Sequence, residues 1–230
     1  MPPSEEIVTS ADIRVEHMHI RHSVYYAVIE PRGTHPRPPS LLVAAHGYGQ
    51  SCKGFIRKFD ALADRNFLVV APQGPNQFYW QETGKVGFTW MTRHGRENSI
   101  PDLMEYMAQL MERLTGAHAF DSGRVFSLGF SQGTALAFRF GASGIVAPRG
   151  VIACGGDLPP DVAERLDTLA PFPAMIVHGR DDTTMSFAKA EEGSVTLRAH
   201  GFGVTTHYFD GGHDIGPEQV EEIAAWMERQ

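Results

Sequence analysis

The chain has little cysteine, no long apolar run and no cluster of basic residues, and each absence excludes a class of protein. Two cysteines, Cys52 and Cys154, are too few for a disulfide framework and lack the spacing of a zinc or redox motif, so we expect two reduced thiols. No apolar run approaches the roughly 20 residues of a membrane span, and the N-terminal MPPSEEIVTS lacks the basic and apolar regions of a signal peptide. We therefore expect no stable membrane insertion and a cytoplasmic location.

The charge and composition favour a globular protein that does not bind nucleic acid. The formal net charge is −7, and the 20 lysines and arginines are scattered, so no basic surface is expected to attract phosphates. Hydrophobic residues make up 42% of the chain and charged residues 20%, which is typical of a globular protein with a substantial core. A length of 230 residues fits one domain.

Short apolar runs alternate with helical patterns from residue 41 onward. Strands of a parallel sheet covered on both faces by helices are predicted at 41–45, 67–72, 124–130, 150–154, 174–179 and 204–211. Helices are predicted at 55–65, 100–114, 131–140, 185–200 and 217–228, and the second of these would be capped by Ser99 and bury its methionines in the core. This order predicts a doubly wound α/β sheet, in which ligands bind at the carboxyl ends of the strands.

The first 40 residues have a different pattern. Residues 13–15 and 24–29 are rich in β-forming side chains and predict an opening antiparallel pair, followed by a proline-rich connection at 31–40. His17, His19 and His22 lie close together in this part of the chain. No cysteine or carboxylate cluster joins them, so a surface strand is a better interpretation than a metal site.

The clearest chemical signal is the stretch RVFSLGFSQGTALAFRF, in which Gly129, Ser131 and Gly133 follow an apolar run. Because the chain has 24 glycines, a shuffled copy would contain G-x-S-x-G about 0.13 times, so the pattern alone does not identify a nucleophile. The position is more informative, since Ser131 lies between a predicted strand and a predicted helix, as a nucleophile elbow requires. The helix N-terminus also favours the negative charge that develops there. We predict that Ser131 is a nucleophile.

A serine hydroxyl needs a base to take its proton and a third group to orient that base. His213, in FDGGHDIGPE, follows the last predicted strand and is the best candidate for the base. Asp182 is preferred as the acid. Its neighbour Asp181 and the earlier Asp157 are alternatives, because all three residues follow predicted strands. The order Ser131, Asp182, His213 matches the chain order of the triad in α/β-hydrolases.

Two backbone N–H groups are needed to stabilise the tetrahedral oxygen. One is expected from Gln132, the residue after the nucleophile, and the other from Tyr48 in the loop AAHGYGQ, where flanking glycines leave its amide free to turn inward. His46 precedes this loop, and its place at a strand exit favours a buried imidazole bonded to loop backbone over a catalytic role.

Four motifs in this order, HGYGQ, GFSQG, HGRDD and GGH followed by DIGPE, resemble the phospholipase/carboxylesterase family of α/β-hydrolases, which contains acyl-protein thioesterases and small bacterial carboxylesterases. The resemblance runs from about residue 41 to the C-terminus. It implies Ser131 as nucleophile, His213 as base, Asp182 as acid and an oxyanion hole from Tyr48 and Gln132. The thioesterases of the family usually have HGLGD where this chain has HGYGQ, so Tyr48 brings a bulky phenol and Gln50 replaces a carboxylate.

Together these observations predict one α/β-hydrolase domain over residues 1–230, with an opening hairpin and connection at 1–38 and a catalytic core at 39–230. The expected activity is hydrolysis of carboxylic esters, and of thioesters as a further class, with small to medium acyl chains, through an acyl-enzyme on Ser131. The same triad would also serve acyl transfer, peptidase activity or hydrolysis of polysaccharide esters, and a non-catalytic binding module is a less favoured alternative.

An aromatic segment with regularly placed glycines at residues 76–94 is a candidate for lining the substrate pocket. Candidate pocket residues are Tyr48, Phe78, Trp80 and Trp90, although the aromatic side chains of the segment could equally pack under a long loop as a small core. The expected partner is a small-molecule ester, and the chemistry needs no metal or other cofactor. The sequence is compatible with a monomer or a homodimer.

Overall fold

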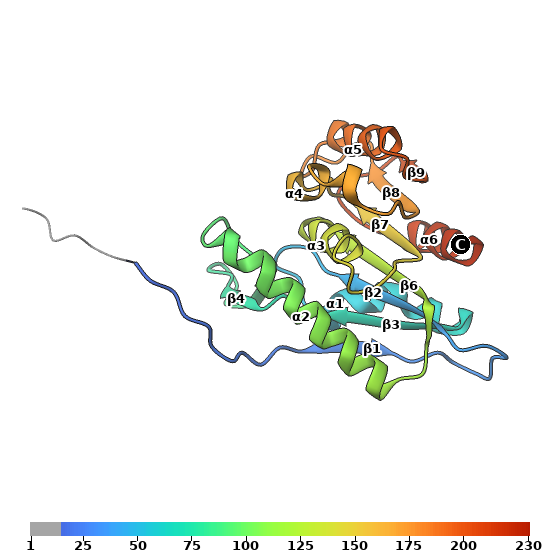
Figure 1. The fold of residues 1–230 in the computed structure, drawn as a ribbon, viewed down its shortest axis with the longest axis horizontal. Helices are drawn as coiled ribbons and strands as arrows, with labels where there is room; N and C mark the ends of the chain where they lie inside the picture. The colour runs from blue at the N-terminus through green and yellow to red at the C-terminus, as the bar shows by residue number, and fades with distance from the viewer. Residues whose placement is uncertain (1–14) are drawn as a thin grey trace, which may run out of the picture.

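The protein is described by a computed structural model that places residues 15–230. Its centre is a seven-stranded sheet in the order β1-β3-β2-β6-β7-β8-β9 (Figure 1). The strands are β1 (Tyr26–Ile29), β2 (Ser40–Ala45), β3 (Phe67–Pro72), β6 (Asp121–Phe130), β7 (Gly150–Cys154), β8 (Ala174–Gly179) and β9 (Val204–Phe209). Strands β2, β3 and β6 to β9 are parallel to one another. The predicted α/β fold class is therefore confirmed.

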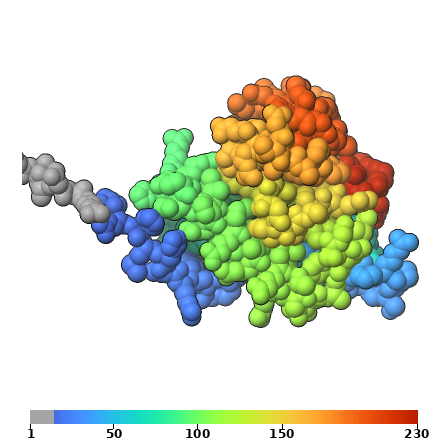
Figure 2. Space-filling view, in the orientation of Figure 1, coloured from blue at the N-terminus to red at the C-terminus, as the bar shows by residue number. Residues whose placement is uncertain are grey.

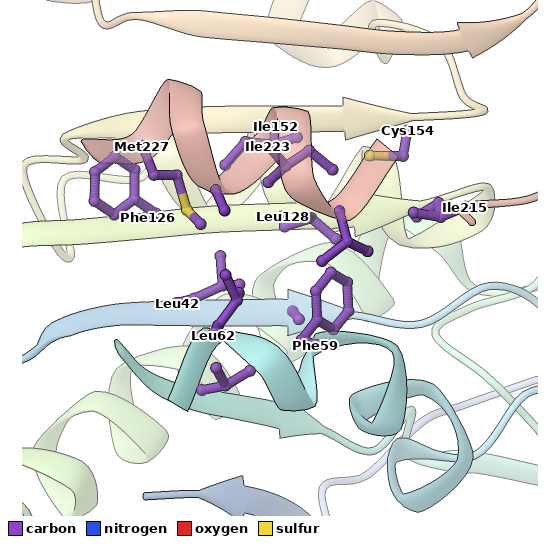
Figure 3. Close-up of a cluster of buried hydrophobic side chains, with 14 of the residues drawn as sticks. Leu42, Phe59, Leu62, Phe126, Leu128, Ile152, Cys154, Ile215, Ile223 and Met227 are labelled. Atoms are coloured by element: carbon purple, nitrogen blue, oxygen red, sulfur yellow. The ribbon is translucent and has the colours of Figure 1, made fainter. Parts of the chain in front are cut away.

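Helices cover both faces of the sheet, which is why β2, β3, β7 and β8 are buried along their whole length. The longer helices are η1 (Ile56–Arg65, 3-10), α2 (Arg96–Ala117), α3 (Gln132–Gly141), α5 (Phe187–Ala199) and α6 (Pro217–Arg229). Side chains of η1 and α6 share one buried cluster, in which Met227 of α6 lies beside Phe126 of β6 (Figure 3). Helices α2, α3 and α5 contribute to two clusters on the other face.

The structure corrects two details of the N-terminal half. The second strand of the expected opening pair is present as β1, but it pairs antiparallel with β3; residues 13 and 14 lie outside the described residues, and Val15 is in no strand. Helix α2 begins at Arg96 with Gly95 as its N-cap, so Ser99 is not the cap. The Ser99 hydroxyl instead donates to the carbonyl of Gly95 inside the first turn. The methionine stripe of α2 is buried as predicted, with Met107 at 1% exposure.

Residues 15–25 form no helix or strand; they come in from one end of the body and then run beside α2, where His19 Nε2 lies 3.6 Å from Asp102 Oδ1 (Figures 1 and 2). His17, His19 and His22 are exposed there, so the expected surface strand is absent at these histidines. Among residues 15–230, no three or more His, Cys, Asp or Glu side chains are grouped to hold a metal ion. In the same range, no helix combines the length and apolar character that crossing a membrane requires.

The remaining elements lie in connections between the main ones. They are the helices α1 (Cys52–Phe55) and α4 (Pro160–Ala163), the 3-10 turn η2 (Leu166–Thr168), and the antiparallel hairpin strands β4 (Asn76–Tyr79) and β5 (Val86–Thr89). The β4–β5 hairpin accounts for the aromatic segment at residues 76–94 and belongs to a separate two-stranded sheet. Cys52 and Cys154 are both free and buried.

Candidate active site

Ser131 occupies the turn between β6 and α3 and has a backbone conformation that non-glycine residues rarely adopt. Its φ and ψ are 54° and −120°, and only one other non-glycine residue between 15 and 230 has positive φ. The turn is held on both sides, because Ser131 N–H donates to the carbonyl of Cys154 at 2.8 Å and Thr134 N–H donates to the carbonyl of Ser131 at 3.0 Å. Strain retained at one serine between a strand and a helix is the geometry expected of a nucleophile elbow.

The two glycines of the motif allow the elbow to form because side chains would not fit there. A Cβ on Gly129 would overlap the carbonyl of Gly133, and a Cβ on Gly133 would overlap the carbonyl of Ala45 at the end of β2. Each approach brings backbone against backbone, which a flexible side chain cannot relieve. The sequence G-x-S-x-G at this place therefore follows from how closely β2, β6 and α3 approach one another.

His213 and Asp182 form a hydrogen-bonded pair at the carboxyl ends of β8 and β9. The distance from His213 Nδ1 to Asp182 Oδ2 is 2.6 Å, and the side chain of Asp182 is fully buried. The two loops that carry these residues are joined through their backbones, since Asp181 N–H donates to the carbonyl of Gly211 at 3.0 Å. The alternative acids do not take this place, because Asp181 is exposed and neither it nor Asp157 bonds to His213.

The carboxylate of Asp182 is surrounded by hydrogen-bond donors. Burial by itself would raise its pKa, but the amide of Met185, the imidazole of His213 and the amide of Thr184 together lower the pKa below its ordinary value. The two amides donate to Oδ1 at 2.8 Å each. Asp182 is thus held as an anion whose Oδ2 accepts the His213 N–H and fixes the orientation of the ring.

The imidazole of His213 lies beside the turn that carries Ser131. Its ring packs on Phe130, the residue before Ser131, with centroids 4.8 Å apart. A Cβ added to Gly155 would lie 3.3 Å from His213 Nδ1 and 3.2 Å from the ring of Phe130, so Gly155 leaves room for both rings. The structure therefore brings Ser131, His213 and Asp182, three residues far apart in the sequence, to one edge of the sheet.

The loop after β2 passes close to the same serine. A Cβ on Gly47 would lie 3.3 Å from Ser131 Cβ, so the backbone entering Tyr48 runs directly past the nucleophile candidate. Gln50 shapes this loop, because Gly47 N–H donates to its Oε1 at 2.9 Å. Among residues 15–230 no acceptor is bonded to the amide of Tyr48, and the amide of Gln132 begins α3, where it has no acceptor within the helix. Both predicted oxyanion-hole amides are available for a ligand oxygen.

His46 lies under this loop as a neutral, fully buried imidazole. Its Nδ1 donates to the carbonyl of Gly47 at 2.8 Å, and its Nε2 accepts from the amide of Gly74 at 3.0 Å and from the carboxamide of Gln73 at 2.7 Å. Burial lowers the pKa of His46 to about 4. The prediction of a structural imidazole bonded to loop backbone is confirmed.

Comparison with known proteins agrees with the fold. The sequence profile of the Phospholipase/Carboxylesterase family matches residues 25–229. The chain belongs to the phospholipase/carboxylesterase family. The resemblance inferred from the four motifs is confirmed, and the match extends to β1, beyond the region from which the motifs came.

Solved structures similar to this family member share its architecture at low sequence identity. Esterase PE8 is 21% identical, with a TM-score of 0.72 over 90% of this chain and 98% of that one. The Bacillus cereus carboxylesterase is 20% identical, with a TM-score of 0.68 over 90% of this chain and 94% of that one. The Zea mays acyl-protein thioesterase 2 is 20% identical, with a TM-score of 0.66 over 89% and 98%. At these identities the likeness shows the fold.

This phospholipase/carboxylesterase family member has supporting residues that the motif search missed. The sequence predicted a role for Gln132 only through its backbone amide. Its side-chain carboxamide also accepts from Trp90 N–H at 3.1 Å and donates to the carbonyl of Met91 at 2.9 Å. Lys58 of η1 anchors the loop of His213 by donating to Asp214 Oδ1 at 2.9 Å. Both contacts join segments more than 40 positions apart, so local sequence carries no signal for them.

The four pocket candidates separate into two groups. Tyr48, Phe78 and Trp80 contact one another at the surface, with the rings of Tyr48 and Phe78 stacked at 4.9 Å. Trp90 is only 1% exposed, packs on the ring of His46 at 4.8 Å and donates its indole N–H to the carbonyl of His46. Trp90 thus occupies the core, as in the alternative interpretation of the segment.

Proposed function

We propose that this protein is a serine esterase that cleaves carboxylic esters, and thioesters as a second class, through an acyl-enzyme on Ser131. The observation that carries the proposal is the meeting of the strained Ser131 turn with the His213–Asp182 pair at one edge of the sheet. A lone serine in a tight turn would not require a buried, fully bonded carboxylate behind a histidine that packs on the preceding residue.

The proposed reaction proceeds in two halves. Ser131 Oγ attacks the ester carbonyl while His213 Nε2 takes its proton, and the amides of Tyr48 and Gln132 donate to the tetrahedral oxygen. His213 then returns the proton to the leaving alcohol or thiol as its bond to the carbonyl carbon breaks. Water repeats the attack on the acyl-enzyme, releases the carboxylic acid and restores Ser131. Asp182 keeps Nδ1 protonated throughout, because its Oδ2 accepts that proton's hydrogen bond.

Residues 47–50, in the loop after β2, supply the Tyr48 amide of the proposed oxyanion hole, and we call them the oxyanion loop. The bulky Tyr48 in this loop favours small to medium acyl chains. Its side chain is 53% exposed and stands at the rim of the site with Phe78, where the thioesterase motif of the family places a leucine. The proposed donors to the ester carbonyl are the backbone N–H groups of Tyr48 and Gln132, which carry no formal charge. Binding of the carbonyl therefore does not require a charged substrate.

The test is labelling together with hydrolysis. A fluorophosphonate should label wild-type protein at Ser131 and leave Ser131→Ala unlabelled, and the wild type should release acid from ethyl butyrate and from butyryl thioesters in a pH-stat. Loss of the nucleophile should lower the rate by at least about 10⁴-fold. Hydrolysis of neither ester nor thioester at any chain length, with no labelled serine, would reject the proposal.

A further inference from the structure

Three aromatic side chains form a corner on the surface beside the loop that carries the Tyr48 amide. Tyr48 stacks on Phe78 with the ring planes inclined by 21°, and Trp80 meets Tyr48 nearly at a right angle, 85°. Trp80 also packs edge to face on Phe78, with centroids 5.2 Å apart. We call Tyr48, Phe78 and Trp80 the aromatic corner.

The corner keeps ring surface exposed where a small core would bury it. Tyr48 is 53% exposed and Trp80 40% exposed, whereas Trp90, which follows β5 of the same hairpin, is 1% exposed. The hairpin therefore sends one tryptophan into the core and holds the other at the surface. Aromatic surface left open beside a candidate nucleophile is typical of a ligand subsite.

The corner is rigidly built, because Trp80 rests on two glycines. A Cβ on Gly87 would lie 2.7 Å from Trp80 Nε1, and a Cβ on Gly49 would overlap the six-membered part of the indole. Gly49 also has φ of +77° and donates its N–H to the carbonyl of Phe88 at 2.7 Å. This hydrogen bond ties the β4–β5 hairpin to the oxyanion loop, so the rings are held in place before a ligand arrives.

The position of the corner connects it to the reacting carbonyl. A Cβ on Gly47 would lie 3.3 Å from Ser131 Cβ, and Tyr48, the next residue, contributes both a candidate oxyanion donor and a ring of the corner. An ester whose carbonyl oxygen reached the Tyr48 amide would therefore place one of its substituents against these rings.

We propose that the aromatic corner binds an aromatic ring of the substrate, so that the preferred substrates are esters with a ring on the acyl or alcohol side. The proposal rests on the proposed function of Ser131. A flat ring can stack on one exposed face of the corner while its edge meets the other face, an arrangement that aromatic pairs favour. A straight alkyl chain gains only buried area from the same surface.

The experiment compares two pairs of esters in a pH-stat. Methyl benzoate and methyl hexanoate place the ring or chain on the acyl side, and benzyl acetate and hexyl acetate place it on the alcohol side. Nitrophenyl esters are avoided because their leaving group is itself a ring. The variants are Trp80→Leu, which keeps apolar volume without a ring, and Trp80→Phe, which restores one. Tyr79→Leu is the matched control, because Tyr79 is 73% exposed and points to the opposite face of β4.

For at least one pair, Trp80→Leu should lower kcat/KM for the ring ester about three- to tenfold more than for its straight-chain partner. Trp80→Phe should recover most of that loss, and Tyr79→Leu should leave the ratio within about twofold of wild type. Equal losses on both members of each pair, or the same loss in Tyr79→Leu, would overturn the ring subsite. Turnover of the straight-chain esters alone would also overturn it while leaving the proposed function intact. Failure on all four esters with no fluorophosphonate labelling would reject both.

Discussion

The hydrogen bonds of Asp182 distinguish two neighbouring carboxylates that the sequence could not separate. Each oxygen of Asp182 has its own donors: the amides of Thr184 and Met185 bond to Oδ1, and His213 bonds to Oδ2. The Nε2 of His178 also lies 3.3 Å from Oδ2, but it hydrogen-bonds to the carbonyl of Met185 at 2.9 Å and is not one of these donors. Since the side chain is fully buried, these donors replace the water that a carboxylate would otherwise bind. One position along the chain, Asp181 has none of this environment.

Replacing the acid should therefore affect catalysis far more than replacing its neighbour. In Asp182→Asn the side-chain amide can donate to His213 Nδ1, which would favour the wrong imidazole tautomer, so kcat should fall by roughly 10³- to 10⁴-fold. Asp181→Asn is the matched control and should stay within about twofold of wild type, because Asp181 is exposed. Steady-state kinetics on one ester measures both. A larger loss in Asp181→Asn than in Asp182→Asn would contradict the assignment.

Among the secondary-structure elements, the β4–β5 hairpin and helix α3 are joined by one side chain. Gln132, the first residue of α3, accepts from Trp90 N–H at 3.1 Å and donates to the carbonyl of Met91 at 2.9 Å. Thr89 Oγ1 at the end of β5 completes the group, 2.8 Å from Gln132 Nε2. Any residue except proline could supply the backbone amide of position 132, so the glutamine side chain has a separate role: it holds the β4–β5 hairpin against the turn that carries Ser131.

Gln132→Glu tests this link with almost no change in shape. The carboxylate cannot donate to the carbonyl of Met91, which keeps only the Thr89 hydroxyl as a donor and faces a new negative charge. The free energy of unfolding should therefore fall by about 1–3 kcal/mol. The loosened hairpin should also lower kcat/KM. Gln77→Glu, at an exposed position of β4, makes the same chemical change outside this link and should alter neither quantity appreciably. Urea unfolding and ester kinetics on both variants provide the measurement, and indistinguishable variants would disprove the link.

Sequence periodicity predicted the strands of the main sheet from residue 41 onward but not every pairing or helix boundary. Every predicted strand from residue 41 onward is present, because runs buried on both faces leave an unmistakable apolar pattern. The pairing of β1 with β3 was missed, since a half-buried strand of four residues carries no signal for which neighbour it joins. The start of α2 was missed because Gly95 caps it through a left-handed backbone without a side-chain bond. Ser131, Asp182 and His213 could be proposed as a site because each follows a predicted strand, whereas the Gln132 and Lys58 contacts depend on tertiary packing.

In the molecule as a whole, His46 lies where three segments meet beneath the candidate oxyanion loop. It follows β2, accepts hydrogen bonds from residues 73 and 74 after β3, and packs on Trp90 after β5. Its Nε2 accepts from an amide that can only donate, so the ring must stay neutral for this joint to hold. Protonation of one buried imidazole would therefore strain the central sheet, the β4–β5 hairpin and the loop after β2 together.

This arrangement predicts that stability falls on mild acidification. Burial lowers the pKa of His46 from 6.5 to about 4, so between these pH values the unfolded chain binds a proton there that the folded protein does not. The stabilising contribution is full above pH 6.5 and is lost as the pH falls toward 4, by on the order of 3 kcal/mol. Asp161, whose pKa is lowered by its hydrogen bond to Arg139, acts in the same direction at lower pH.

Urea unfolding from pH 7 to 4.5 measures how the free energy of unfolding depends on pH. This dependence should be flatter in His46→Asn than in wild type or in His94→Asn, which removes an exposed imidazole. An NMR titration of the wild type supplies a check that needs no variant, and a His46 ring that protonates near pH 6.5 in the folded protein would refute the prediction.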